Sequence, residues 1–243
     1  MKNKKLFFKK RIQEPSVMDS LDFKSFINLS NEKYLVWFVP LVDSIIDIYG
    51  SKKGKILDLA CGPGFLAKEL SLRSDNFDIF CLDYSKHAIH LAKKNCKGMG
   101  NIHFIVGRVE KLPYKDSTFD LIVCKDSFHH FKSAEKALKE ILRVLKIGGI
   151  FYMQDLRRDL PSYFIKQTLP LDNSIKKLQY YSVRASYTKQ ELIRILEKFH
   201  PKHFRVFTRI LDKKTKDRYN KKRIDLIQLK NSFQSRYVLV LKK

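Results

Sequence analysis

A buried strand that breaks into a glycine turn and then a helix is the feature that most constrains this chain. It reads KILDLACGPG over residues 55–64 and is followed by the helix-like run FLAKEL. Small residues in such a turn let the backbone approach a ligand closely, and a helix N-terminus presents free N–H groups to it. The next apolar run ends at Asp83, about 20 residues on, where a ribose-binding acid is expected. The segment therefore predicts a loop that binds an adenosine-containing cofactor.

The glycine turn alone leaves the kind of cofactor open. Residues 62–67 also fit the dinucleotide fingerprint G-x-G-x-x-G/A, which is typical of nicotinamide domains. A six-residue glycine pattern has low specificity, so the surrounding chain has to decide.

Strand-like and helix-like segments alternate after residue 50. The predicted strands are short apolar runs without alternation, which is typical of strands buried on both faces of a parallel sheet. They cover residues 55–59, 77–82, 101–106, 119–124 and 149–154, and the helices between them cover 64–73, 85–97 and 133–145. Two late strands, at 203–210 and 235–242, are expected to pair antiparallel at the sheet edge. The fold class is therefore α/β, a Rossmann-like doubly wound sheet, mostly parallel with an antiparallel last strand pair.

Helix-start signals and composition divide the rest of the chain. Residues 28–49 have helical periodicity, with Ser30 as the expected N-cap and Pro40 as a possible kink. Ser85 and Ser133 are further N-caps, and the capping box at Thr188 opens a helix that reaches about residue 199. We expect a basic N-terminal extension over residues 1–27 and one domain over 28–243, with a substrate cap inserted near 156–186.

Charge and cysteine usage limit the partners. The net charge is +24, and two basic segments, in the N-terminal extension and at 211–223, carry part of it. Such segments bind nucleic acid or anionic surfaces, or are solvated faces of a lysine-rich protein; the second interpretation is favoured because lysine outnumbers arginine. The four cysteines form no C-x-x-C pair and indicate reduced core thiols in a cytoplasmic protein. No spacing predicts a metal site, and no apolar run is long enough for a membrane span.

Five sequence blocks in order resemble the class I S-adenosylmethionine-dependent methyltransferases. The similarity spans roughly residues 30–243 and is closest to small-molecule enzymes such as those of quinone biosynthesis. The blocks are ILDLACGPG at 56–64, FCLDYS at 80–85, GRVEKLP at 107–113, STFDLIVC at 117–124 and LKIGGI at 145–150. The last block has Ile147 where the family usually has proline. A short N-terminal stretch, RIQEP at 11–15 through Met18 and Asp19, also resembles bacterial members of that family.

The resemblance implies S-adenosylmethionine as the cofactor and a set of residues that bind it. Asp83 would accept hydrogen bonds from both ribose hydroxyls, and Asp58 would pair with the cofactor ammonium. The complete implied set is Asp58, Ala60, Cys61, Gly62, Gly64, Asp83, Tyr84, Arg108, Val109, Glu110, Lys125 and Ser127.

The acceptor side is expected where strands four and five end. His130, or its neighbour His129, is a candidate base, with a purely structural histidine as the alternative. Arg157, Arg158, Arg184 and Tyr187 are candidate substrate-binding residues, because a guanidinium fork suits a carboxylate or phosphate. The alternative for the two adjacent arginines is an ion-pair cluster with Asp155 and Asp159.

The predicted function is methyl transfer to a small acceptor, anionic or aromatic, by direct displacement. An RNA methyltransferase that uses the two basic segments is the alternative. A nicotinamide oxidoreductase and a binder that has kept the fold without catalysis also stay open.

Overall fold

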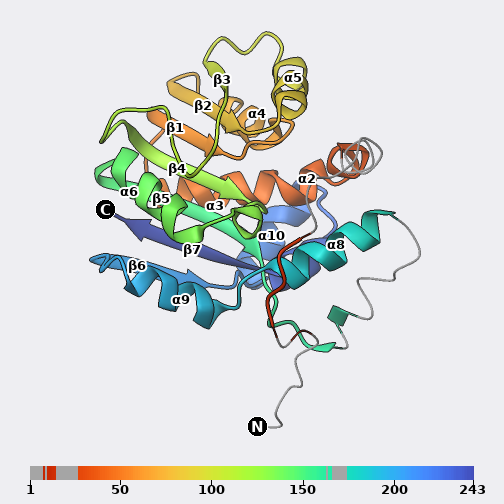
Figure 1. The fold of residues 1–243 in the computed structure, drawn as a ribbon. Helices are drawn as coiled ribbons and strands as arrows, with labels where there is room; N and C mark the ends of the chain where they lie inside the picture. Colours follow the sequence, from red (N-terminus) through yellow and green to blue (C-terminus); the bar gives the residue numbers. More distant parts are fainter. Residues whose placement is uncertain (1–7, 9, 15–26, 163, 166–173) are drawn as a thin grey trace.

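In the described part of the chain, seven strands form one sheet in the order β3-β2-β1-β4-β5-β7-β6 (Figure 1). The computed structural model describes residues 8, 10–14, 27–162, 164–165 and 174–243. The strands are β1 Gly54–Leu59, β2 Phe77–Asp83, β3 Ile102–Val106, β4 Phe119–Lys125, β5 Leu145–Leu156, β6 His203–Phe207 and β7 Arg236–Lys242. The first five are parallel to one another, and β7 runs antiparallel to both β5 and β6. This order confirms the predicted fold class, including the antiparallel pair at the edge.

Helices cover both faces of the sheet. They are α2 Tyr34–Trp37, α3 Val39–Tyr49, α4 Phe65–Ser71, α5 Lys86–Asn95, α6 Ala134–Val144, α8 Ser174–Ala185, α9 Lys189–Glu197, α10 Lys213–Lys221 and α11 Leu226–Gln234, with the 3-10 turn η1 at Phe128–His130. Successive residues of one strand point to opposite faces, so Ile56 belongs to the apolar cluster that includes α3 and α4, while Leu57 belongs to the one that includes α6 and α9. Each face thereby buries its own apolar cluster, as a doubly wound sheet requires.

Local signals place several helix ends correctly. Side-chain oxygens of Ser85 and Ser133 accept from backbone N–H groups in the first turns of α5 and α6. Thr188 and Glu191 form the complete capping box that opens α9. These side chains accept hydrogen bonds from backbone N–H groups that have no partner within the helix. The capping residues therefore allow these helix ends to be predicted from the sequence.

Other local predictions are wrong. Ser30 lies within a helical segment and is buried, so it is no N-cap. Pro40 lies in the first turn of α3, where its missing N–H has no helical partner to lose, and the chain breaks at Phe38 instead of bending at the proline. The stretch 211–223, expected as a plain connection, contains α10, capped by Asp212 and anchored by the buried ring of Tyr219.

The described N-terminal residues pack on the domain near α8 (Figure 1). The backbone N–H of Ile12 donates to Arg184 O, and Arg11 donates to the carbonyls of Ala185 and His129. Phe8 joins a small apolar cluster that includes Leu160 and Val183. Most of the predicted extension, residues 1–7, 9 and 15–26, lies outside the described residues.

All four cysteines are buried and free. Among the described residues, no helix has the length and hydropathy that crossing a membrane requires.

Candidate active site

The turn after β1 uses its two glycines for different reasons. Both have positive φ, +53° at Gly62 and +81° at Gly64, a region that favours glycine. A Cβ at Gly64 would lie 3.0 Å from the Cβ of Ala92 in α5, so this glycine lets α4 and α5 pack closely. A Cβ at Gly62 would have no atom within 4 Å and would point into open space. The space beside Gly62 is therefore open, as a ligand-binding turn requires, while Gly64 serves the packing of α4 on α5.

Asp83 joins this turn to the end of β2. Its two carboxylate oxygens accept from the backbone N–H groups of Gly62 and Ser85, each at 2.9 Å. The side chain is buried, and burial raises the pKa of this carboxyl above its ordinary value. Each oxygen retains a lone pair, so the carboxylate can still accept from two neighbouring hydroxyls.

Asp58 is the most unusual acid of the site. It is 1% exposed, and its Oδ2 has no hydrogen-bond partner among the described residues. Burial raises its pKa to about 7. A buried carboxylate oxygen without a partner is costly unless a ligand supplies the missing donor. An ammonium group fits this requirement, so Asp58, Gly62 and Asp83 together fit the ammonium, backbone and ribose of S-adenosylmethionine.

The predicted adenine-side residues lie after β2 and β3. Tyr84 is exposed, and so is Arg108. Val109 is buried in the apolar cluster that also contains Leu82, and the carboxylate of Glu110 accepts from the backbone N–H of Lys132 at 3.1 Å. The exposed ring of Tyr84 is suited to a flat heterocycle, whereas Val109 packs in the core and Glu110 holds the next loop.

Lys125 and Ser127 place the loop after β4 over the glycine turn. The Lys125 ammonium pairs with Asp126 at 2.6 Å and lies over the ring of Phe38 at 4.9 Å. Burial lowers the pKa of this lysine. The hydroxyl of Ser127 donates to Lys125 O at 2.8 Å and approaches Ala60 O at 3.4 Å, which ties the two loops together.

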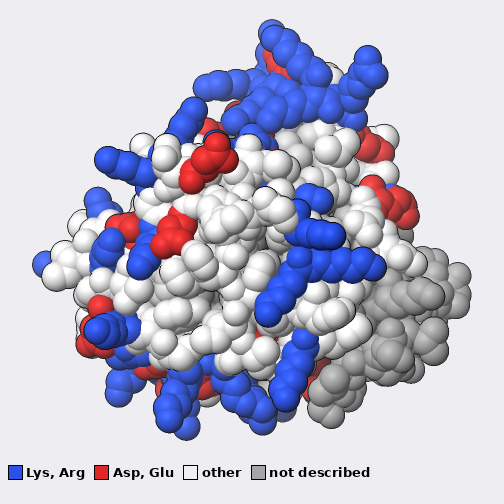
Figure 2. Space-filling model, turned by 90° about the horizontal axis from the view of Figure 1, so that it is seen from above, with Lys and Arg blue, Asp and Glu red and all other residues white. Residues whose placement is uncertain are grey.

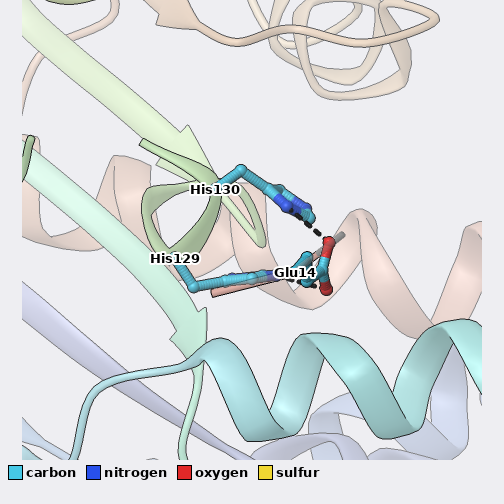
Figure 3. A group of neighbouring side chains, drawn as sticks. All are labelled: Glu14, His129 and His130. Atoms are coloured by element: carbon cyan, nitrogen blue, oxygen red, sulfur yellow. Dashed lines mark ion pairs between the residues drawn. The ribbon is translucent and has the colours of Figure 1, made fainter. Parts of the chain in front are cut away.

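The two histidines of η1 face a carboxylate from the far N-terminus (Figure 3). His130 Nδ1 lies 2.8 Å from Glu14 Oε2. His129 is 1% exposed, and its Nδ1 lies 2.6 Å from Asp155 Oδ1 at the end of β5. Although burial lowers the pKa of His129, Asp155 and Glu14 outweigh it and raise the pKa. His130 is therefore the accessible histidine and His129 the fixed one.

The candidate substrate arginines are already bonded within the protein. Arg157 makes a two-pronged bond to Asp159, from Nε at 2.6 Å and from Nη2 at 2.9 Å. Arg158 is 1% exposed and donates to Ser186 O, to Phe8 O and to Glu191. Substrate binding by either one would first require these bonds to break. The ion-pair alternative with Asp159 describes Arg157, whereas Arg158 pairs with Glu191 and Asp155 pairs with His129.

Arg184 and Tyr187 lie beside the N-terminal residues. The Arg184 guanidinium covers the ring of Tyr181 at 5.0 Å, and its Nε has no hydrogen-bond partner among the described residues. The Tyr187 ring is covered by Arg11 at 4.3 Å and contacts Phe128 at 5.8 Å. Tyr187 therefore contacts η1 through Phe128, and the substrate-binding role of both residues stays a prediction.

Comparison with known families settles the class of the domain. The family described as "Methyltransferase domain" matches residues 50–200. The chain belongs to this methyltransferase family. Its membership confirms the resemblance drawn from the five sequence blocks and identifies S-adenosylmethionine as the cofactor.

Curated relatives of the methyltransferase domain include proteins of quinone metabolism. The chain is 34% identical over 103 residues to the uncharacterized methyltransferase YcgJ of Bacillus subtilis, covering 42% of this chain and 40% of that protein. It is 32% identical over 120 residues to a demethylmenaquinone methyltransferase of Thermotoga maritima, covering 49% and 50%. The chain thus spans about half the length of the curated relatives it matches.

Solved structures share the fold over nearly the whole chain. An S-adenosylmethionine-dependent methyltransferase of Methanococcus maripaludis matches with a TM-score of 0.64 and 22% identity, covering 94% of this chain and 96% of that one. The plantazolicin methyltransferase BpumL, solved with S-adenosylhomocysteine and a desmethyl substrate analogue, matches with a TM-score of 0.71 and 20% identity, covering 93% and 92%. At these identities the likeness establishes the fold.

Proposed function

We propose that this protein transfers the methyl group of S-adenosylmethionine to a small aromatic acceptor. The observation that carries the proposal is the combination of an unpartnered buried carboxylate at Asp58, an open cradle at Gly62 and a second acid at Asp83. The class of acceptor is supported by the relatives named demethylmenaquinone methyltransferase. An anionic acceptor, the other predicted class, has less support because Arg157 and Arg158 are bonded internally.

The cofactor would lie across the carboxyl ends of β1 and β2. We assign Asp83 to the ribose hydroxyls, Asp58 to the ammonium, and the turn of Ala60, Cys61, Gly62 and Gly64 to the methionine end. Tyr84, Arg108, Val109 and Glu110 would flank the adenine. Lys125 and Ser127 would close the site from the β4 side, where their loop already reaches the carbonyl of Ala60.

The chemistry is a displacement at carbon. The acceptor's electron pair forms the new bond to the methyl carbon while the carbon–sulfur pair returns to sulfur, which leaves S-adenosylhomocysteine. The protein's task is to align the nucleophile, the methyl carbon and the sulfur and to exclude water, and alignment supplies up to roughly 7–11 kcal/mol. His130, half exposed and hydrogen-bonded to Glu14, is the residue we assign to take the acceptor's proton.

The domain arrangement follows from these assignments. We propose one methyltransferase domain over residues 28–243, with residues 156–186 as the cap above the acceptor. Residues 8 and 10–14 of the N-terminal extension would complete this cap, since they bond to Arg184, Ala185 and η1.

Basic charge alone supports the RNA alternative. On the face drawn in Figure 2, lysine and arginine side chains lie in several groups with uncharged surface between them. Binding of RNA that weakens steeply with added salt would revive that alternative.

The first test is calorimetric titration of the full chain with S-adenosylmethionine, S-adenosylhomocysteine and NAD. We expect the first two to bind and NAD not to bind. Asp83→Ala should weaken cofactor binding more than tenfold, because it removes a charged acceptor. The matched control is Asp78→Ala, an exposed acid on the same strand that pairs with His103. Unchanged affinity in a folded Asp83→Ala protein would refute the cofactor site.

The acceptor class needs its own assay. Formation of S-adenosylhomocysteine should be followed with hydroquinones of increasing side-chain length and with phenolic acids. Turnover of the hydroquinones supports an aromatic acceptor, whereas turnover of a purely aliphatic anion instead would overturn that part of the proposal.

A further inference from the structure

Two buried polar atoms near the acceptor side lack any partner among the described residues. They are Oε1 of Glu14 and Nε2 of His129, which lie 3.9 Å apart. Buried polar groups are nearly always hydrogen-bonded, because an unpaired one keeps the cost of its lost hydration. Two such atoms that face each other at this separation indicate a missing third group between them.

The atoms around this gap are metal-ligand types. One ligand atom from each of Glu14, His129 and His130 can be chosen so that all three lie within 4.8 Å of one another. Figure 3 shows the carboxylate and both rings directed toward one another from two separate parts of the chain. Two imidazoles and one carboxylate are a ligand set for zinc and for the other divalent first-row metals.

The surroundings of His129 support the same interpretation. Asp155 holds Nδ1 of His129 at 2.6 Å, and its other oxygen accepts the backbone N–H of His129 at 2.9 Å. A carboxylate on one ring nitrogen fixes the tautomer and leaves the other nitrogen as a free lone pair, as in most metal-binding histidines. The ring is thus held with Nε2 aimed into the gap.

We propose that Glu14, His129 and His130 bind one divalent transition-metal ion. Tetrahedral ligands about 2.1 Å from a common ion lie about 3.4 Å apart, so the 3.9 Å pair has to close by about half an ångström. The widest pair also has to close, and His130, whose side chain is 36% exposed, has room to turn once the ion replaces its bond to Glu14. The site would leave at least one coordination position for water or substrate, as catalytic metal sites do.

A salt bridge without metal is the competing account. A protonated His129 between Asp155 and Glu14 would also neutralise the cluster. However, 3.9 Å is too long for a hydrogen bond, so this account leaves Nε2 and Oε1 unsatisfied. The two accounts can be told apart by titration, because only a metal site binds an ion with a defined stoichiometry.

The position of the metal site suggests a role for the ion in methyl transfer, and this role rests on the proposed function. The loop that carries the histidines touches the glycine turn, because the hydroxyl of Ser127 approaches the carbonyl of Ala60 at 3.4 Å. An ion there would bind an acceptor oxygen and lower its pKa, so that its proton leaves to solvent before that oxygen takes the methyl group. With the ion bound, His130 would be a ligand, and the ion would replace it in removing the acceptor's proton.

The test uses the tag-free full chain after treatment with a chelator. Titration with Co²⁺, followed by its visible absorption, and with Zn²⁺, followed by calorimetry, should show one ion per chain. Glu14→Gln and His130→Ala should each weaken binding at least tenfold. The matched controls are Asp78→Asn and His103→Ala, which alter an exposed histidine–carboxylate pair of similar length, 2.7 Å, and should bind as the parent does. Circular dichroism and the thermal unfolding transition, compared with those of the parent, confirm that each variant is folded.

Each outcome separates this site from the proposed function. Absence of one-to-one binding, or equal binding in Glu14→Gln, His130→Ala and the controls, would overturn the metal site whatever the enzyme does. Binding of one ion per chain by the parent, with loss of that binding in Glu14→Gln and in His130→Ala, supports the site. This result holds even when no acceptor is methylated, because the titration contains neither cofactor nor acceptor.

Discussion

The two halves of the candidate site are built in different ways. The cofactor half lies mainly at the ends of β1 and β2, with further residues that follow β3 and end β4. The acceptor half, at the ends of β4 and β5, combines η1, Asp155, the cap and residues of the N-terminus. The cofactor half therefore needs only β1 to β4 and their turns, whereas the acceptor half also needs β5, the cap and the N-terminal residues.

The halves also use buried charge differently. In the cofactor half, Asp58 keeps an unpartnered oxygen and a raised pKa, which a ligand can relieve. In the acceptor half, Arg158 and Asp155 are bonded from several sides by the protein itself. Charge in the first half is left open for a small molecule, while charge in the second mostly holds distant segments together.

Arg158→Ala should cause the largest loss of stability among these variants, and the loss should come from the acceptor half only. The substitution leaves the carbonyls of Ser186 and Phe8 and the carboxylate of Glu191 without their donor. We expect the free energy of unfolding to fall by about 3 kcal/mol, as for other broken buried ion pairs. Chemical denaturation measures it, and Arg158→Lys is the partial rescue. A loss below ~1 kcal/mol would mean that this arginine does not hold the cap.

The two glycines should separate fold from function within the cofactor half. Gly64→Ala adds a Cβ 3.0 Å from Ala92 at positive φ, so we expect a stability loss of about 1–3 kcal/mol. Gly62→Ala meets no protein atom and should cost only about 1 kcal/mol of backbone strain. Its main effect should be weaker cofactor binding in calorimetry. Equal binding by Gly62→Ala and the parent would show that the open space at residue 62 is not the cofactor's.

Cofactor affinity should depend on pH through Asp58. Its pKa is raised to about 7 by burial, so the carboxylate that an ammonium requires is lost as the pH falls through 7. We expect about a tenfold loss of S-adenosylmethionine affinity between pH 8 and pH 6, near the effect of one charged hydrogen bond. Asp58→Asn should bind weakly and with little pH dependence.

In the ligand-free protein, the ionisation of Asp58 should lower the free energy of unfolding as the pH rises. A carboxyl whose folded pKa is raised holds its proton more tightly when folded, so its contribution to stability declines as the pH rises from about 4 to about 7. Asp58→Asn should remove this decline in urea unfolding at several pH values. A parent protein whose stability does not fall more steeply than the variant's over this window would contradict the assignment.

Arg157→Ala should have the smallest effect, although its neighbour has the largest. Its partner Asp159 lies two residues away, and the Arg157 side chain is about a quarter exposed. An ion pair of this kind contributes roughly 0–1 kcal/mol. Thermal unfolding of Arg157→Ala and Arg158→Ala should therefore give very different losses of stability. The difference measures how much the position of an arginine in the fold determines its contribution.

The sequence by itself determined the cofactor half and the order of elements that carries it. Apolar runs, glycines at positive φ and capping residues such as Ser85 act within a few residues of chain, so their patterns are visible without the fold. The roles assigned there, including those of Asp58 and Asp83, are still predictions, but their location at adjacent strand ends follows from the pattern.

The tertiary structure alone decided the acceptor half. No local pattern links Glu14 to His130, or Asp155 to His129, because each pair joins segments that meet only when β5 lies between β4 and β7 and the N-terminal residues lie along α8. Arg157 and Arg158 are adjacent and identical in the sequence, yet one lies at the surface of a loop and the other within the cap. The physical reason is that burial and long-range pairing are set by how elements pack, and the composition of one segment does not contain that information.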